Sequence, residues 1–179
     1  MKKYIVPLAI FAAIGGLLMY ALYLSVTGGY SPRDIPSPFK GKSLPILSLP
    51  TLHEPDRIVS SETFRGHVYL LNAWGSWCPA CRQEHQMLNE IARTKVVLIV
   101  GLNFKDKRID ALRWLDTLGN PYQTILFDES GRSAIDVGVY GAPETFVIDK
   151  NGIVREKHIG PITPEVWEKK LAPLIKELS

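Results

Sequence analysis

The sequence has few cysteines, little net charge and no internal repeat. Its two cysteines can form one bridge at most, so they cannot build the dense disulfide network of a small secreted scaffold. The formal net charge of +3 is too small to indicate a nucleic-acid partner, which would require a clustered basic patch. Apolar residues make up 46% and charged residues 22%, which excludes disordered and collagen-like chains. What remains is a chain of 179 residues, long enough for one domain with a full hydrophobic core.

Charge is also absent from a long stretch near the N-terminus. Lys2 and Lys3 supply two of the three net positive charges, and the next charged residue is Arg33. Between them residues 5–26 are strongly apolar, and as a helix they would span about 33 Å, enough for a hydrocarbon core of roughly 30 Å. The lysines ahead of this run predict a cytoplasmic N-terminus. The sequence therefore predicts a single membrane-spanning signal anchor.

A cleaved signal peptide is the alternative for this segment. It would have a shorter apolar core of about 7–15 residues, followed by small residues at the cleavage site. Here bulky side chains fill residues 20–24, and residues 25–27 form only a weak candidate site. We therefore favour an uncleaved anchor. The domain organisation predicted is a cytoplasmic start and transmembrane anchor at 1–27, a spacer rich in Gly, Ser and Pro at 28–39, and a folded domain at 40–179.

The hydrophobic pattern of residues 40–179 alternates between strands and helices. Apolar runs of strand length predict buried strands, helical periodicity predicts helices, and an Asn-Gly pair at 151–152 predicts a hairpin. The expected elements are an N-terminal ribbon at 44–49 and 57–59, a helix cap at 60–63, strands at 68–74, 96–102, 125–128, 144–149 and 153–159, and helices at 79–92, 111–118, 130–137 and 164–178, the last kinked at Pro173. This order predicts an α/β fold with a central mixed sheet, an antiparallel edge and helices on both faces.

The two cysteines lie three residues apart, where the first buried strand gives way to a helix. Cys78 is expected at the helix N-terminus, where unpaired backbone N–H groups and the helix dipole favour a thiolate. Pro79 suits the first helical turn because its missing N–H needs no partner there. Cys81 would lie about one turn further in and be more shielded. We therefore expect Cys78 to attack a partner's disulfide as the nucleophile, and Cys81 to resolve the mixed disulfide.

Three other roles for this Cys-x-x-Cys pair stay open. A purely structural disulfide is one, although a bridge between residues three apart constrains little chain. A zinc site is another, but it needs four ligands, and the sequence has no second Cys pair and no well-spaced His pair. The third is copper binding by both thiolates with His85, although helical periodicity places His85 on the surface. Redox exchange is the interpretation that we adopt, with no cofactor and no metal.

The residues around the cysteines resemble a known family. Trp74-x-x-Trp77-Cys78-x-x-Cys81 after a hydrophobic strand is similar to the thioredoxin superfamily. More narrowly, residues 71–85, 101–106, 119–122 and 138–146 resemble the CcmG/DsbE family of membrane-anchored thioredoxin-like proteins of cytochrome c maturation. The resemblance covers nearly the whole chain, with these motifs in the family's order. The sequence departs from thioredoxin itself at Asn72, which stands where thioredoxin has a buried aspartate, so proton transfer to Cys81 cannot use a carboxylate at that position.

The resemblance implies a thioredoxin-like fold, in which a cis proline faces the dithiol. Pro143 is therefore predicted to be cis, which a fold can hold because a cis X-Pro bond costs only about 0.5–1 kcal/mol. The Ala142 backbone would then be free to pair with an extended substrate strand. Trp77 is expected to shield the dithiol, and Tyr140 to lie on the surface beside Pro143. Without the resemblance, a trans proline opening an edge strand would be the expectation.

Two acidic residues are expected near the dithiol. Glu84 lies one helical turn after Cys81, and Glu144 stands beside Pro143. A nearby negative charge disfavours a thiolate, so both acids are expected to raise the pKa of Cys78. A less stable thiolate makes the dithiol a better electron donor. The alternative is that both acids are ordinary solvated charges.

The function that the resemblance implies is that of a thiol:disulfide oxidoreductase acting as a periplasmic reductant in cytochrome c biogenesis. Anchored in the bacterial inner membrane, it would keep the Cys-x-x-Cys-His cysteines of apocytochrome c reduced. A membrane electron-transfer protein of the DsbD or CcdA type would reduce it in turn. Two other functions stay open: a related thioredoxin-like reductase for cytochrome oxidase copper-site assembly, and a non-catalytic copper carrier or apocytochrome-holding module. None of these functions involves nucleic acid.

Overall fold

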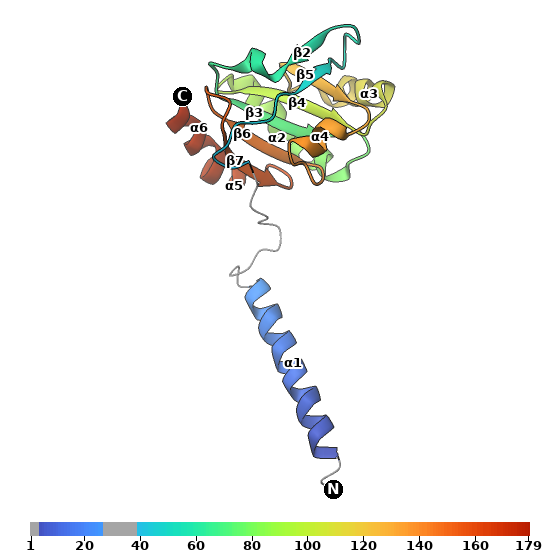
Figure 1. Ribbon diagram of the computed structural model, residues 1–179, viewed down its shortest axis with the longest axis vertical. Helices are drawn as coiled ribbons and strands as arrows, with labels where there is room; N and C mark the ends of the chain where they lie inside the picture. Colours follow the sequence, from blue (N-terminus) through green and yellow to red (C-terminus); the bar gives the residue numbers. More distant parts are fainter. Residues whose placement is uncertain (1–3, 27–38) are drawn as a thin grey trace. The chain divides into compact units, whose positions relative to one another are not determined.

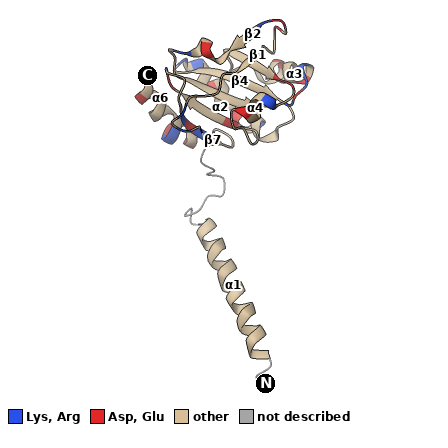
Figure 2. Cartoon of the chain, viewed as in Figure 1, with Lys and Arg blue, Asp and Glu red and all other residues tan. Residues whose placement is uncertain are grey.

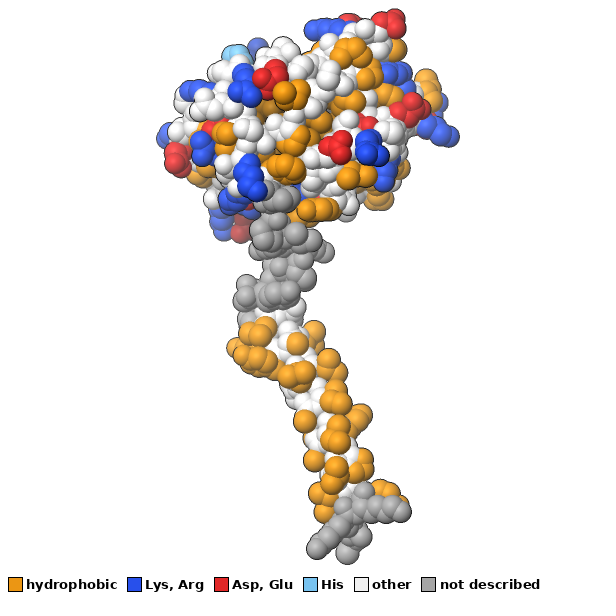
Figure 3. All heavy atoms as spheres, in the orientation of Figure 1, with side chains coloured by type: hydrophobic (Ala, Val, Ile, Leu, Met, Phe, Trp, Pro, Cys, Tyr) orange, Lys and Arg blue, Asp and Glu red, His pale blue; other side chains and the backbone are white. Residues whose placement is uncertain are grey.

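The computed structural model describes residues 4–26 and 39–179, so Lys2, Lys3 and all but the last residue of the predicted spacer at 28–39 lie outside the described residues. The chain divides into two units, Met1–Ile35 and Pro36–Ser179, and each is described by itself. In the first unit, helix α1 (Ile5–Val26) has no charged residue, as Figure 2 shows. Hydrophobic side chains lie along the helix and are largely exposed (Figure 3). Its segment Ile5–Ser25 is long and apolar enough to cross a membrane, by length and composition. This is the helix that the apolar run predicts.

The second unit is built on a five-stranded sheet with the strand order β5-β4-β3-β6-β7 (Figure 1). β3 (Tyr69–Trp74), β4 (Leu98–Phe104) and β5 (Thr124–Asp128) run parallel to one another. β6 (Glu144–Ile148) pairs antiparallel with β3, and β7 (Val154–Ile159) pairs antiparallel with β6. Every residue of β3 is buried, which explains its continuous apolar run. The mixed sheet with an antiparallel edge is therefore confirmed.

Helices cover both faces of this sheet. On one face, β3 packs against α2 (Pro79–Thr94), α3 (Arg108–Leu118) and the C-terminal helical segment. The crossovers β3–α2–β4 and β4–α3–β5 step across the sheet in the same direction, so right-handed connections place α2 and α3 on the same face. The other face is covered by the short helix α4 (Arg132–Asp136) and by the N-terminal residues Leu44, Leu47, Val59 and Phe64. The dithiol helix α2 thus lies on the face with more helical cover.

The chain ends in a helical segment with an irregular middle. It consists of α5 (Pro164–Val166), a π-helical turn, η3 (Trp167–Leu171), and α6 (Ala172–Leu178). In the π-helical turn, the backbone N–H of Ala172 reaches back to the carbonyl of Trp167. Pro173, which has no N–H to continue the α-helical ladder, follows directly. The kink predicted at Pro173 therefore takes the form of a wide turn just before it.

The predicted N-terminal ribbon is present as β1 (Ser48–Pro50) paired antiparallel with β2 (Ile58–Ser60). Ser60 then caps a short 3₁₀ helix, η2 (Ser61–Phe64), by accepting a hydrogen bond from Glu62 N–H at 3.2 Å. A Ser at this position satisfies a backbone N–H that has no partner within the helix. The helix cap predicted at 60–63 is therefore found, one residue before a helix of four residues.

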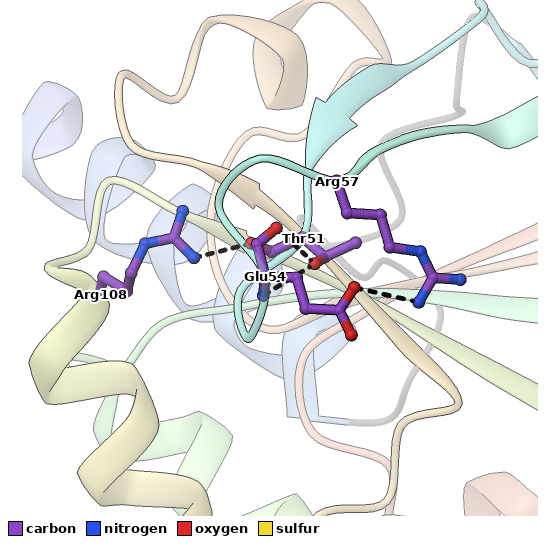
Figure 4. Close-up of polar contacts among 4 residues, drawn as sticks. All are labelled: Thr51, Glu54, Arg57 and Arg108. Carbon is purple, nitrogen blue, oxygen red and sulfur yellow. Dashed lines mark hydrogen bonds and ion pairs between the residues drawn. The ribbon is translucent and has the colours of Figure 1, made fainter.

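One arginine fastens the loop between β1 and β2 to the start of α3 (Figure 4). The Arg108 guanidinium donates to the backbone carbonyls of Thr51, at 2.7 Å, and of Leu52. The Thr51 hydroxyl donates to the Glu54 carbonyl at 2.9 Å and accepts from the Glu54 N–H at 3.1 Å. Glu54 and Arg57 form an exposed ion pair at 3.4 Å. Arg108 therefore supplies the hydrogen bonds of two carbonyls that the short ribbon leaves unpaired.

Candidate active site

Cys78 and Cys81 lie at the start of α2, directly after β3, and are joined in a disulfide. Cys78 is the N-cap of the helix, and its Sγ accepts a hydrogen bond from the Cys81 N–H at 3.0 Å. Pro79 occupies the first helical position, where its missing N–H costs nothing.

The two cysteines are equally buried in this oxidised state, which differs from our expectation. Cys78 is 2% exposed and Cys81 is 3% exposed, so Cys81 is not the more shielded of the pair. The reason is that β3, α2 and neighbouring aromatic residues enclose both sulfurs in one hydrophobic cluster. What distinguishes Cys78 is its place at the helix N-terminus, where backbone N–H groups stabilise negative charge on its sulfur. That difference supports Cys78 as the attacking thiolate.

Trp77 lies over the loop that leads into the dithiol. Its indole N–H donates to the Phe104 carbonyl at 3.2 Å, and the two rings meet edge-on with centroids 5.7 Å apart. A Cβ added to Gly75 would lie 2.4 Å from Trp77 Nε1, so a glycine is required for the indole to lie this close to the backbone. Trp77 is 49% exposed. It therefore presents a half-exposed aromatic surface one residue before Cys78.

Asp106, two residues after the end of β4, holds the same loop. Its carboxylate accepts hydrogen bonds from the Ser76 N–H at 2.6 Å and from the Ser76 hydroxyl at 2.7 Å. It also accepts from the Asn103 amide at 2.9 Å and from the Lys107 N–H at 2.8 Å. The carboxyl ends of β3 and β4 lie at the same edge of the sheet, which brings residues 76 and 106 together. Sequence reasoning missed Asp106 as a site residue, although an acid two residues after a buried strand was a signal that could have found it.

Glu84 and Asn72 form a buried polar cluster on the sheet face that carries the dithiol. The Asn72 side-chain amide donates to Glu84 Oε1 at 2.8 Å and to the Thr145 hydroxyl at 3.0 Å. Asn72 Oδ1 accepts from the Tyr122 hydroxyl at 2.8 Å. The second carboxylate oxygen of Glu84 accepts from the Ile162 N–H at 2.8 Å. The amide nitrogen and oxygen of Asn72 and both carboxylate oxygens of Glu84 therefore have hydrogen-bond partners.

Burial dominates the protonation of Glu84. The residue is 1% exposed, and desolvation raises the pKa of its carboxyl to about 7, against the lowering effect of its two N–H donors. Glu84 is therefore not a solvated helix charge, and it changes its protonation near neutral pH. It lies one helical turn from Cys81. Asn72 stands where thioredoxin has an aspartate on the strand. In this chain the carboxylate comes from α2, where Glu84 accepts a hydrogen bond from the Asn72 amide.

The peptide bond between Ala142 and Pro143 is cis, as the resemblance implies. Glu144 follows directly and is buried, with its Oε2 2.8 Å from the Lys157 ammonium. Phe146 and Ile148 of β6 pack on the face opposite α2, and the alternation of a strand places Glu144 on that face too. Glu144 is therefore not an unpaired negative charge beside Cys78, and the predicted rise of the Cys78 pKa rests on Glu84.

His85 is buried, which corrects the expected surface position. The residue is 3% exposed, its Nε2 lies 2.8 Å from the Gly119 carbonyl, and Trp114 Nε1–H approaches its Nδ1 at 3.4 Å. Helical periodicity failed here because α2 packs against α3 as well as against the sheet. Burial lowers the pKa of the imidazole, and the neutral form satisfies both ring nitrogens. Because both nitrogens are engaged, His85 does not offer a copper ligand beside the dithiol.

Among residues 4–26 and 39–179, no group of three or more His, Cys, Asp or Glu side chains is arranged to hold a metal ion. The site therefore consists of a disulfide at a helix N-terminus, the aromatic Trp77 beside it, a buried acid at one turn's distance and a cis proline opening the neighbouring strand. The chemistry that these groups support is thiol–disulfide exchange.

The mixed sheet and its Cys-x-x-Cys helix define a thioredoxin-like thiol:disulfide oxidoreductase. The redoxin family model matches residues 39–173. The chain is 45% identical to the thiol:disulfide interchange protein DsbE of Allochromatium vinosum, over 97% of this chain and 93% of that protein. It is 42% identical to the protein of the same name from Escherichia coli, over 99% of this chain and 96% of that protein. The chain belongs to the DsbE family of thiol:disulfide interchange proteins.

Solved structures agree with this fold. The crystal structure of a DsbF homologue from Corynebacterium diphtheriae superimposes on this chain with a TM-score of 0.67 and 23% sequence identity. The match includes 83% of this chain and 97% of that one. At that identity the similarity shows the shared fold alone. The thioredoxin-like architecture predicted from the sequence is thus confirmed.

Proposed function

We propose that this protein is a periplasmic reductant of cytochrome c maturation, whose Cys78–Cys81 dithiol reduces the haem-attachment cysteines of apocytochrome c. Family membership supports the exchange chemistry. The buried carboxyl of Glu84 is the observation that supports electron transfer from the dithiol to the partner. A carboxylate near the dithiol opposes formation of a thiolate. A dithiol whose thiolate is less stabilised gives up its electrons more readily, which is the property of a reductant.

The exchange proceeds in two steps. The Cys78 thiolate attacks one sulfur of the partner's disulfide, which forms a mixed disulfide and releases the partner's first thiolate. Cys81 then loses its proton and attacks Cys78 Sγ, which forms the Cys78–Cys81 disulfide and releases the partner's second cysteine. Two electrons pass to the partner, and its two thiolates each take up one proton. Glu84 is placed to adjust this protonation, because its carboxyl titrates near neutrality one turn from Cys81.

The proposed placement follows the order of the segments along the chain. Residues 1–27 anchor the protein in the bacterial inner membrane with the N-terminus in the cytoplasm, residues 28–39 form a spacer, and residues 40–179 form the periplasmic domain. The length of α1 and the two lysines before it support this orientation. An oxidised dithiol must then be reduced from the membrane side, and an electron-transfer protein of the DsbD or CcdA type would supply the two electrons.

Trapping of mixed disulfides tests the proposed substrate. Cys81→Ala in the full-length chain leaves Cys78 able to attack but removes the resolving thiol, so covalent complexes accumulate. We expect mass spectrometry to identify apocytochrome c peptides with a Cys-x-x-Cys-His motif in these complexes. The double variant Cys78→Ala/Cys81→Ala is the control and should trap nothing. Capture of copper-site assembly proteins in place of apocytochromes would overturn the proposed substrate, and metal binding without any trapped partner would overturn the exchange function itself.

A further inference from the structure

Lys157 is a buried cation on β7 that the exchange chemistry does not use. Its side chain is 2% exposed, as is that of Glu144, and the ammonium lies 2.8 Å from Glu144 Oε2. The ammonium also donates to the Gly138 carbonyl at 2.8 Å and lies 4.2 Å from the centroid of the Tyr140 ring. A buried ion pair costs desolvation energy that an apolar pair would avoid. Its presence at this place therefore calls for a role beyond packing.

The contacts of this ion pair converge on one loop, residues 138–142, which leads into the cis proline. Lys157 holds the loop's first carbonyl and the face of its aromatic ring. Glu144 Oε1 accepts the backbone N–H of Tyr140 at 3.1 Å and of Gly141 at 3.2 Å. The inner side of the loop is therefore fixed at four points by two charged side chains.

The outer side of the same loop is open. Tyr140 is 62% exposed, and a Cβ added to Gly141 would meet nothing within 4 Å. Because Glu144 engages the N–H groups of Tyr140 and Gly141, the loop turns these donors inward. The Ala142 backbone and the free part of the Tyr140 ring are left as the groups that this edge offers to a partner. An aromatic ring held in place by a cation beneath it presents contact area at little entropic cost.

We propose that Lys157 is a positioning residue for the protein substrate. With Glu144 it holds residues 138–142 in one conformation, so that an extended peptide carrying a disulfide meets a preformed edge beside the dithiol. Because the loop is ordered before binding, the peptide gains affinity that a mobile loop would lose. The inference rests on the proposed function in one respect: the substrate is an extended, disulfide-bonded protein segment. It does not depend on which protein supplies that segment.

The test compares two charge-neutral double variants of the full-length protein in detergent. Lys157→Met/Glu144→Gln removes both buried charges together, so neither is left unpaired. The matched control is Arg155→Met/Asp149→Asn, which removes an ion pair of 2.6 Å between the start of β7 and the hairpin before it. A third variant, Tyr140→Leu, removes the aromatic ring and leaves the ion pair. The melting temperature of each variant shows that it is folded.

Each reduced variant is oxidised by a disulfide-bonded peptide with a Cys-x-x-Cys-His motif, by a peptide of the same composition in scrambled order, and by hydroxyethyl disulfide. For Lys157→Met/Glu144→Gln we expect the KM for peptides to rise about tenfold at unchanged kcat, which corresponds to about 1.4 kcal/mol. The rate with hydroxyethyl disulfide should not change, because this molecule is too small to use the loop. Tyr140→Leu should raise the peptide KM in the same direction, and the control pair should leave it unchanged.

An unchanged peptide KM in the folded double variant overturns the inference. So does an equal change with peptide and hydroxyethyl disulfide, because the ion pair would then act on the dithiol itself. If the double variant does not fold, Tyr140→Leu decides, and an unchanged KM there overturns the inference. A wild-type protein that does not prefer the Cys-x-x-Cys-His order over the scrambled order contradicts the proposed substrate alone, since the effect of Lys157 on both peptides would still be measured.

Discussion

The carboxylate of Glu84 accepts a hydrogen bond from the side-chain amide of Asn72 at 2.8 Å, across the contact between α2 and β3. This relationship places a buried acid on the dithiol side of the sheet without an acid on the strand itself. The carboxyl is held by two N–H donors and yet titrates close to neutral pH, because burial outweighs both hydrogen bonds. The protonation of the dithiol is therefore expected to depend on a residue of its own helix.

Glu84→Gln should remove a pH dependence of stability. The pKa of Glu84 rises from 4.5 to about 7 on folding, so between these values the folded state binds more protons than the unfolded state. The contribution of Glu84 to stability is therefore fully present below about pH 4.5 and is lost as the pH rises to about 7, by up to about 3 kcal/mol. Urea unfolding of both proteins at pH 4.5, 6 and 8 measures this, and the wild type should lose stability relative to Glu84→Gln along the series. A constant difference between the two proteins would show that Glu84 does not titrate in this range.

His85 should have the opposite effect on stability. Burial lowers the pKa of its imidazole in the folded state, so below about pH 6.5 the unfolded state binds more protons. The contribution of His85 to stability is then present at neutral pH and is lost as the pH falls. In urea unfolding at pH 7.5 and pH 5, the advantage of the wild type over His85→Gln should shrink at pH 5. An NMR titration in which the His85 ring protonates at its ordinary pKa would contradict this.

Asp106→Asn should loosen the loop before Cys78. The variant loses charge-assisted hydrogen bonds to Ser76, each worth about 1.5–3 kcal/mol. We expect a comparable loss of unfolding free energy and faster hydrogen exchange at the Ser76 N–H. The matched control is Asp110→Asn on α3, whose exposed ion pair with Arg113 contributes at most about 1 kcal/mol. Equal stability losses in the two variants would argue against a role for Asp106 in holding the loop.

The sequence predicted the architecture well because the physics that sets it is local. Buried parallel strands have continuous apolar runs, and the Cys-x-x-Cys helix starts with a proline at its first position. The bounds of the strands and helices are shifted by only a few residues, mainly at their ends, where hydrogen bonding rather than hydrophobicity sets the limit.

The site was only partly predictable, because its polar contacts join elements far apart in the chain. Asn72 meets Glu84 where the sheet packs against the helix, and no periodicity links the two residues. Lys157 was missed because a β-bulge between Val147 and Ile148 shifts the register of β7. The shift places Lys157 on the same face as Val154, a spacing of three that strict alternation does not predict.

The reduction potential of the Cys78–Cys81 couple tests the central claim most directly. The full-length protein is equilibrated in redox buffers of glutathione and dithiothreitol at pH 7, and the reduced fraction is read by alkylation of its thiols. We expect a value between about −180 and −270 mV, the range from protein disulfide isomerase to thioredoxin, as suits a dithiol that donates electrons. A value near about −120 mV, that of a strong oxidase, would contradict the account of this protein as a reductant.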